Sequence, residues 1–234
     1  MAKPPLKTCV LIPAYNEEKH VAAVVREVLD YCPDVIVIDD GSPDDTDKAA
    51  AEAGAVVLEH VHNRGKGAAL QTGFDYAREN GYDLAITMDA DGQHAPSDIP
   101  AFLQAYERTH SPVFVGNRMG DVGDMPWNRR FVNRFMSDLL SRVMGQHVPD
   151  SQCGFRLYHR SAFPEGPYDA HSQRFAAESE ILLRLALQGR KIGAVAIQTI
   201  YGAEKSKVNP FTDTIRFFRM LHRFRKIKKE FLAK

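Results

Sequence analysis

Short apolar runs alternate with segments of helical periodicity along the first 120 residues, and this alternation limits what the chain can fold into. Residues 8–12 and 34–38 each contain four successive apolar side chains, a pattern typical of strands buried on both faces. Strands separated by helices predict an α/β fold with a mainly parallel central sheet flanked by helices. In this half we expect strands at 8–12, 34–38, 55–58, 82–88 and 113–115, and helices at 17–31, 46–53, 67–79 and 97–108.

The second half is less regular but continues the same kinds of segment. Its apolar spacing predicts helices at 128–144, 178–188 and 212–232 and strands at 154–158 and 192–200. With 234 residues and neither an internal repeat nor a clear linker, the chain suits one domain with a small appendage. We expect that domain to cover residues 1–210 and a basic amphipathic helix to cover 211–234.

Charge is distributed unevenly, although the chain carries 30 basic and 30 acidic side chains. Residues 205–234 hold ten Lys and Arg against Asp213 and Glu230, so the preceding residues carry the balancing acidic excess. Phenylalanines interleaved with these cations fit a helix in peripheral contact with an anionic membrane surface. A solvated helix face explains the charge as well. No nucleic-acid partner is expected.

Several features predict a cytoplasmic protein. Cys9, Cys32 and Cys153 show no paired spacing and are expected to be reduced thiols. Residues 1–7 do not resemble a signal peptide, and no apolar run reaches the length that spans a bilayer. Membrane contact is therefore expected to be peripheral, on the cytoplasmic face.

Acidic residues gather where the expected strands end, which is the edge where open parallel sheets bind ligands. Asp89 and Asp91 follow one strand, and two carboxylates at this spacing can point into one cleft. Such hard oxygen ligands suit Mg²⁺ or Mn²⁺, with diphosphate oxygens completing the shell and Gln93 or His94 as a further ligand. The alternative is an Asp-rich turn that caps a helix.

Two further segments suggest a nucleotide. Asp39 and Asp40 end the second strand, where a carboxylate can accept hydrogen bonds from a base or a ribose, or can simply form a turn. Residues 63–67, Asn-Arg-Gly-Lys-Gly, precede a helix and combine glycines with two cations. That composition fits a phosphate site at a helix N-terminus, with a flexible turn as the alternative.

Seven motifs occur in one order along most of the chain. They are Pro-Ala-Tyr-Asn-Glu at 13–17, Asp-Asp-Gly-Ser at 39–42, Asn-Arg-Gly-Lys-Gly at 63–67, Asp-Ala-Asp-Gly-Gln at 89–93, Val-Gly-Asn-Arg at 115–118, Asp-Ser-Gln-Cys-Gly-Phe-Arg at 150–156 and Glu-Lys-Ser-Lys at 204–207. In this combination the chain resembles a family 2 glycosyltransferase, in particular the dolichyl-phosphate mannose or glucose synthase group. The resemblance implies a GT-A fold, the Rossmann-like fold of nucleotide-diphospho-sugar transferases.

The resemblance also implies roles for individual residues. The nucleotide and donor would be bound by Pro13, Tyr15, Glu17, Asp39, Asp40, Lys66, Asp89 and Lys207. Asp91 and Gln93 would hold the metal, and Arg118, Arg129 and Arg130 would meet an acceptor phosphate. The residues expected to take part in catalysis are Asp89, Asp91, Asp150 and Arg118.

The implied reaction is an inverting, metal-dependent transfer of a hexosyl unit from a GDP-mannose or UDP-glucose type donor. The implied acceptor is a polyprenyl phosphate, dolichyl or undecaprenyl, at the membrane surface. Two positions depart from the relatives that use such acceptors: Tyr201 stands where they often carry Arg, and Asn133 where a Ser is expected.

Two alternatives remain open. A sugar hydroxyl of a cell-envelope glycan or glycolipid could be the acceptor, and it would require a carboxylate base, for which Asp150 and Glu178 are the candidates. A different class altogether is a membrane-surface adaptor with an inactive nucleotide site.

Overall fold

Seven strands among the described residues form one sheet in the order β3-β2-β1-β4-β6-β5-β7. The computed structural model describes residues 5–120, 127–164, 175–198, 200 and 224. All pairings are parallel except those of β6, which runs antiparallel to both neighbours. The α/β architecture with a mainly parallel sheet is therefore confirmed. The strands are β1 (Thr8–Ala14), β2 (Val35–Asp39), β3 (Val56–Glu59), β4 (Leu84–Thr87), β5 (Val113–Asn117), β6 (Arg156–His159) and β7 (Ile192–Ala196).

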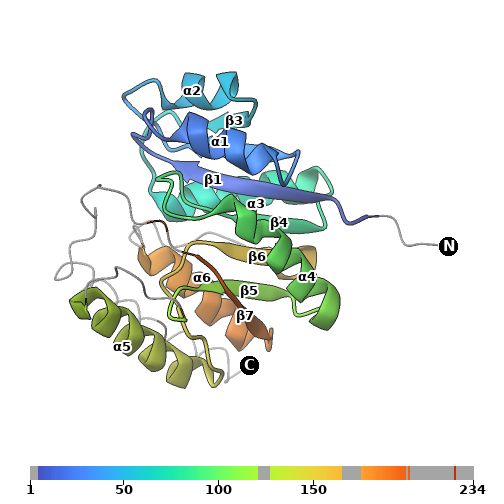
Figure 1. Ribbon diagram of the computed structural model, residues 1–234, viewed down its shortest axis with the longest axis vertical. Helices are drawn as coiled ribbons and strands as arrows, with labels where there is room; N and C mark the ends of the chain where they lie inside the picture. The colour runs from blue at the N-terminus through green and yellow to red at the C-terminus, as the bar shows by residue number, and fades with distance from the viewer. Residues whose placement is uncertain (1–4, 121–126, 165–174, 199, 201–223, 225–234) are drawn as a thin grey trace.

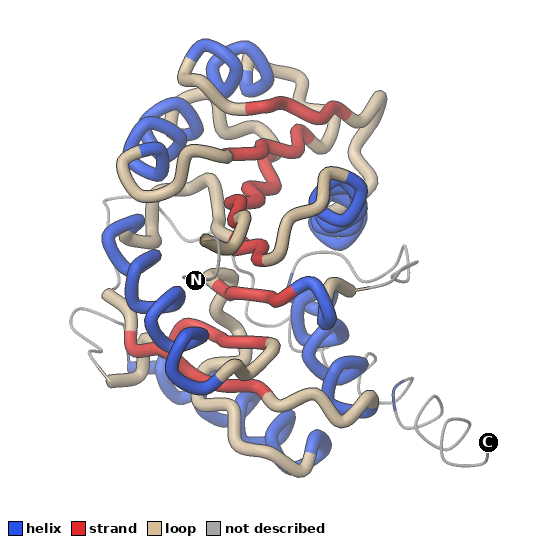
Figure 2. Tube along the Cα trace, turned by 90° about the vertical axis from the view of Figure 1, so that its right-hand side faces the viewer, coloured by secondary structure: helices blue, strands red, loops and turns tan. Residues whose placement is uncertain are grey.

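Helices cover both faces of this sheet. Figure 1 shows α1 and α4 in front of the strands and α3 and α6 behind them, while α5 packs against α6. In Figure 2, turned by 90°, the strands run through the middle with helices on either side. The helices are α1 (Val21–Leu29), α2 (Thr46–Glu52), α3 (Lys66–Glu79), α4 (Ile99–Thr109), α5 (Trp127–Met144) and α6 (Phe175–Leu187), with short 3₁₀ turns at Pro96–Asp98 and Arg160–Ala162.

The core follows from the local patterns of the sequence. All five residues of β2 are buried, as expected for a central strand covered on both faces. In α1 the buried residues are Val21, Val24, Val25 and Val28, which form one stripe at helical spacing. Through this stripe the helix packs against the sheet.

The strand directions bring several loops to one edge. β1, β2, β4 and β5 run the same way, so the segments that follow them lie at the same edge of the sheet. Because β6 is antiparallel, with Arg156 opposite Thr87, the loop that precedes it reaches this edge as well. Residues 13–17, 39–42, 89–93 and 150–155 therefore converge here.

Two predicted boundaries differ from the observed ones by four residues, both because of tertiary hydrogen bonds. The first helix begins at Val21, four residues later than expected, since Asn16 adopts a left-handed φ of 58°. The N–H groups of Asn16 and Glu17 donate to the hydroxyls of Ser42 and Thr46, each at 2.9 Å.

The last described strand ends at Ala196 instead of continuing to Ile200. Beyond it, the Gln198 N–H donates to Asp98 at 2.8 Å and the Ile200 N–H donates to the Gln93 carbonyl at 3.1 Å. These bonds pull the chain away from the sheet and toward the loop after β4.

The expected helix at 212–232 and the domain boundary at 210 lie outside the described residues, apart from Phe224. No helix in the part of the chain that the structure describes is long and apolar enough to cross a membrane.

Candidate active site

The centre of the shared edge is a cluster of Lys66, Asp89 and Glu178, drawn from three separate elements. Lys66 opens α3, Asp89 follows β4, and Glu178 lies in the first turn of α6. The Lys66 ammonium Nζ is 2.5 Å from Asp89 Oδ1 and 3.2 Å from Glu178 Oε1. One cation thus joins two carboxylates that are 89 residues apart in the sequence.

The electrostatics of the cluster favour charged groups. Burial opposes ionisation of Asp89, but the neighbouring Lys66 ammonium outweighs it and holds the pKa of Asp89 well below its usual range. Burial likewise disfavours the Lys66 ammonium, yet Asp89 and Glu178 together raise its pKa above the ordinary value. Asp89 and Lys66 therefore stay ionised at neutral pH and can orient a polar ligand.

Asp91 is the described residue best suited to hold a divalent cation. Burial, reinforced by the negative charge of Asp89, raises the pKa of Asp91, and the Gln93 N–H donates to Oδ1 at 3.1 Å. A carboxylate in this state gains from a nearby cation. Within the described ranges no group of three His, Cys, Asp or Glu side chains could hold a metal alone. Diphosphate oxygens from a bound nucleotide would have to complete the shell.

His94 lies beside these carboxylates and is buried. Its Nε2 is 3.6 Å from Asp89 Oδ2, while its Nδ1 has no hydrogen-bond partner among the residues described here. The residue follows Gln93 directly, so the sequence indicated it only as an alternative ligand. The structure places its ring against Phe155, with centroids 5.4 Å apart.

The backbone of Gly154 lies close to the carboxylates of both Asp89 and Glu178. A Cβ at this position would lie 2.9 Å from both Asp89 carboxylate oxygens and 3.0 Å from Glu178 Oε1. The Gly154 carbonyl also accepts a hydrogen bond from the Thr87 hydroxyl at 2.8 Å, which fixes the backbone at this point. Only a residue without a side chain allows such an approach.

If the chain catalyses the transfer that its motifs imply, we expect Gly154→Ala to lower the turnover about a hundredfold, because the added methyl must displace Asp89 or Glu178 from Lys66. Steady-state kinetics at saturating donor measures this effect. Gly120→Ala is the matched control, since no atom of the described residues lies within 4 Å of a Cβ there. Equal kinetics for the two variants would show that the close approach at Gly154 has no bearing on the reaction.

Arg118 and Asp150 form a second, buried pair at the same edge. The guanidinium donates to both carboxylate oxygens, from Nε at 2.7 Å and from Nη2 at 3.0 Å. Asp150 is fully buried and Arg118 is 7% exposed. Arg118 and Asp150, which were both predicted to take part in catalysis, therefore bind each other directly.

Arg156 holds the surrounding loop and was not singled out by the sequence analysis. It is fully buried and donates to the carbonyls of Ser151, Cys153 and Glu178 at 2.7–2.9 Å. Its position in an otherwise apolar strand could have indicated this role, because a buried Arg requires several hydrogen-bond acceptors around it. Burial also raises the pKa of the Cys153 thiol to about 12, so this thiol is not a nucleophile at neutral pH.

At the end of β2, Asp39 and Asp40 have protein partners. Asp39 accepts the Ser42 N–H and hydroxyl. Asp40 accepts the N–H groups of Arg64 and Gly65 at 2.9 and 2.7 Å, so it ties the loop before α3 to the end of β2.

The residues after β1 line the same edge. Pro13 lies in β1 and pairs in register with Ile38, and the Tyr15 ring is 46% exposed. The Glu17 carboxylate is 3.3 Å from His20 Nδ1. The exposed Tyr15 directly follows Ala14, whose carbonyl accepts the Asp40 N–H at 2.9 Å, so an aromatic residue lies next to the end of β2 in the chain trace.

The predicted acceptor residues and the predicted donor residue Lys207 are only partly described. Arg130 is exposed on α5, whereas the side chain of Arg129 and all of Lys207 lie outside the described part of the structure. Of the predicted acceptor residues, Arg118 contacts Asp150.

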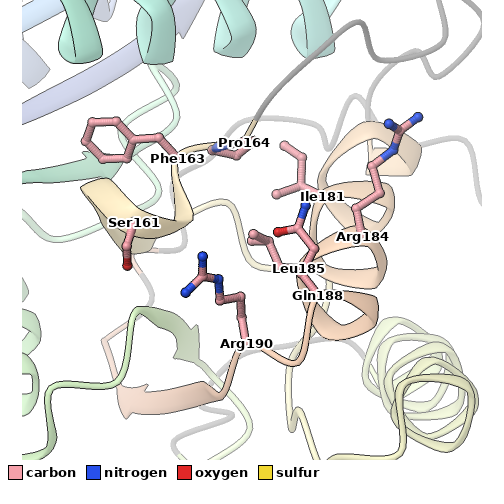
Figure 3. A pocket seen from close by; sticks show the side chains of 8 residues that line it. All are labelled: Ser161, Phe163, Pro164, Ile181, Arg184, Leu185, Gln188 and Arg190. Carbon is pink, nitrogen blue, oxygen red and sulfur yellow. The ribbon is translucent and has the colours of Figure 1, made fainter. Parts of the chain in front are cut away.

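A cavity of about 210 Å³ lies at the opposite edge of the sheet (Figure 3). It is formed where the chain leaves β6 and where α6 passes into β7, with Ser161, Gln188 and Arg190 among its lining side chains. None of the predicted site residues is among the eight described residues that line it. It is therefore distinct from the carboxylate cluster.

Comparison with known proteins places these features in a family. Residues 9–166 match the family model described as glycosyl transferase family 2. A UDP-N-acetylglucosamine–dolichyl-phosphate N-acetylglucosaminyltransferase of Methanococcus voltae is 33% identical over 213 residues, covering 82% of this chain and 85% of that protein. An undecaprenyl-phosphate mannosyltransferase of Micrococcus luteus is 32% identical over 203 residues, covering 82% of this chain and 83% of that protein.

A solved structure confirms the fold. Glucosyl-3-phosphoglycerate synthase from Mycobacterium tuberculosis, crystallised with Mn²⁺, uridine diphosphate and phosphoglyceric acid, superposes with a TM-score of 0.70. The match covers 95% of this chain and 78% of that one at 18% identity. The likeness establishes the architecture of the sheet and its helices, which is the GT-A arrangement.

Proposed function

The chain belongs to glycosyl transferase family 2, and on this premise we propose that it transfers a hexosyl unit, with inversion, from a nucleotide-diphosphate sugar to a polyprenyl phosphate. The observation that carries the proposal is the Lys66–Asp89–Glu178 cluster beside Asp91 at the carboxyl edge of the sheet. Donors of the GDP-mannose or UDP-glucose type are the expected substrates. The relatives supply the acceptor class, since both named above act on lipid-linked phosphates.

The donor would lie along the edge from β2 to β4. Pro13, Tyr15, Glu17, Asp39 and Asp40 are the residues proposed to meet the nucleoside. The loop of residues 63–67 would lie near the diphosphate. Asp89, fixed by Lys66, would orient the sugar. Asp91 and Gln93 would hold Mg²⁺ or Mn²⁺, which supplies positive charge for the leaving diphosphate. Lys66 already lies within this cluster, and Lys207 is proposed to add a second cation.

A phosphate acceptor requires groups that position it but no strong base at this site. Its oxygen is anionic and needs no strong base, so positioning suffices for attack on the anomeric carbon from the face opposite the leaving group. Asp150 holds Arg118 in place through both of its oxygens, and the remaining N–H groups of the guanidinium would meet the phosphate. Arg129 and Arg130 are the further proposed contacts.

The outer face of α5 supports a lipid-borne acceptor. Phe131 and Phe135 are 69% and 51% exposed, and the neighbouring Arg130 and Arg134 are exposed as well. Exposed aromatic rings among cations are typical of a surface that rests on an anionic bilayer. We propose peripheral contact with the cytoplasmic membrane face through this surface and through the basic C-terminal segment, residues 211–234, which the sequence predicts to be an amphipathic helix.

A sugar-hydroxyl acceptor is the second candidate, and one observation favours it. The buried Oε2 of Glu178 has no hydrogen-bond partner among the described residues, so it is available to accept a proton. Asp150 is less suited, because Arg118 binds both of its oxygens. A hydroxyl acceptor would therefore use Glu178 as general base.

A transfer assay with defined substrates tests the proposal. The enzyme is supplied with UDP-glucose, UDP-N-acetylglucosamine or GDP-mannose, with Mn²⁺, and with vesicles that contain undecaprenyl or dolichyl phosphate. We expect one donor to yield a glycosylated polyprenyl phosphate and EDTA to abolish the product. The same donor with Mn²⁺, at about 100 times its dissociation constant, should stabilise the fold by about 2.7 kcal/mol in thermal unfolding.

The alternatives give different results in the same assay. Transfer to a glycolipid but not to polyprenyl phosphate would select the hydroxyl acceptor. Vesicle binding without nucleotide binding or donor hydrolysis would reject the enzyme and favour a membrane adaptor.

A further inference from the structure

We propose that His60 is a positioning residue that holds the loop of residues 63–67, and with it Lys66, in place for the donor diphosphate. The part of this proposal that concerns the donor rests on the proposed function. The residue lies just beyond β3, and its side chain is 4% exposed. Its sequence context offered no metal or catalytic motif.

The anchor of the loop is the carboxylate of Asp40. Its Oδ1 accepts the Arg64 N–H at 2.9 Å, and its Oδ2 accepts the Gly65 N–H at 2.7 Å. Gly65 immediately precedes α3, and Lys66 is the first residue of that helix. The direction in which α3 starts is therefore set by Asp40.

His60 in turn holds Asp40. The imidazole Nδ1 is 2.7 Å from Asp40 Oδ1, and because an ionised carboxylate can only accept, Nδ1 carries the proton. On its other side Nε2 is 2.9 Å from the Thr72 hydroxyl, two turns into α3. One ring thus bridges the carboxylate that fixes the loop and the helix that follows the loop.

The packing leaves this segment little freedom. At Gly41 a Cβ would lie 2.5 Å from the carbonyl carbon of His62 and 2.8 Å from the Asn63 nitrogen, so the two backbones touch. The chain is consequently held between Gly41 and Asp40 on one side and Thr72 on the other. Beyond it, Lys66 reaches Asp89 and Glu178 at 2.5 and 3.2 Å.

The consequence is that loss of the imidazole should loosen the loop without touching the reacting groups. Hydrogen bonds to a buried charged group are among the stronger ones in proteins. We expect His60→Phe to weaken nucleotide-diphosphate binding about tenfold with a smaller change in kcat. His60→Asn should stay within about threefold of the wild type, because its amide can replace the Nδ1 donor.

The test combines two measurements on His60→Phe, His60→Asn and a control. UDP and GDP, each with Mn²⁺, are titrated into the full chain, and amide hydrogen exchange is followed at Arg64 and Gly65. His62→Phe is the matched control, since His62 is exposed two residues away. Support requires weaker nucleotide binding and faster exchange at both amides in His60→Phe, with near wild-type values in His60→Asn and His62→Phe.

The outcomes separate this proposal from the proposed function. Unchanged exchange in folded His60→Phe would overturn the positioning role, and so would faster exchange with unchanged nucleotide affinity. Should His60→Phe not fold, unchanged exchange and affinity in a folded His60→Ala would overturn it equally. If the wild type binds neither UDP nor GDP, the proposed function fails, while faster exchange in His60→Phe would still establish that His60 holds the loop.

Discussion

Replacing Asp150 with alanine is expected to lower the free energy of unfolding by about 3–5 kcal/mol, because it leaves the buried Arg118 guanidinium without its partner. Both oxygens of Asp150 bind this guanidinium, and water has little access to either group. An unpaired buried cation is among the costliest defects in a protein interior. Equilibrium unfolding in urea measures the loss.

Two further variants show whether the lost free energy of unfolding comes from the unpaired charge of Arg118. In Asp150→Ala combined with Arg118→Met, most of the lost stability should return, because neither variant side chain is charged. Asp75→Ala is the matched control: its partner Arg78 is 2.5 Å away on an exposed surface, where such a pair contributes about 0–1 kcal/mol. If Asp150→Ala costs no more than Asp75→Ala, the buried pair does not stabilise the fold as argued here.

Asp91→Asn is expected to lower turnover by about two to three orders of magnitude while leaving the fold intact. The substitution removes the carboxylate proposed to hold the metal but keeps its size. At neutral pH without metal, we expect Asp91→Asn to melt slightly above the wild type. The raised pKa of Asp91 means that folding disfavours its charged form, so its carboxylate costs stability once the pH exceeds the unfolded-state pKa.

The pH dependence of the melting temperature tests whether the charged Asp91 carboxylate destabilises the wild type. As the pH falls and Asp91 becomes protonated in the wild type, the difference in melting temperature between the two proteins should vanish. Asp30→Asn, an exposed acid at the end of α1, is the matched control and should alter neither turnover nor metal dependence. Full Mn²⁺-dependent turnover in Asp91→Asn would contradict the proposed metal site.

Much of the sheet was predictable because its signals are local. Residues 35–38 of β2 are an unbroken apolar run, and α3 begins within one residue of its predicted position after a glycine-rich segment. The edge where the site lies was predictable for the same reason, since Asp39, Asp40, Asp89 and Asp91 all follow strands. Family membership confirms the activity class that the motifs indicated.

The boundaries near the site were not predictable, because they depend on partners distant in the sequence. The first helix starts late since Ser42 and Thr46 bind the N–H groups that a helical turn would otherwise use. The antiparallel direction of β6 could not be predicted from the sequence either. Without it, the loop before Gly154 would not reach Asp89.

The sequence by itself therefore determined the alternation of strands and helices, the family and the carboxylates at the strand ends, because these follow from neighbouring residues. Only the tertiary structure decided which polar side chains pair with one another: Lys66 with Asp89 and Glu178, Arg118 with Asp150, and His60 with Asp40. Each pairing joins residues 20 to 112 positions apart. Electrostatic interaction depends on distance and burial, and the fold sets both.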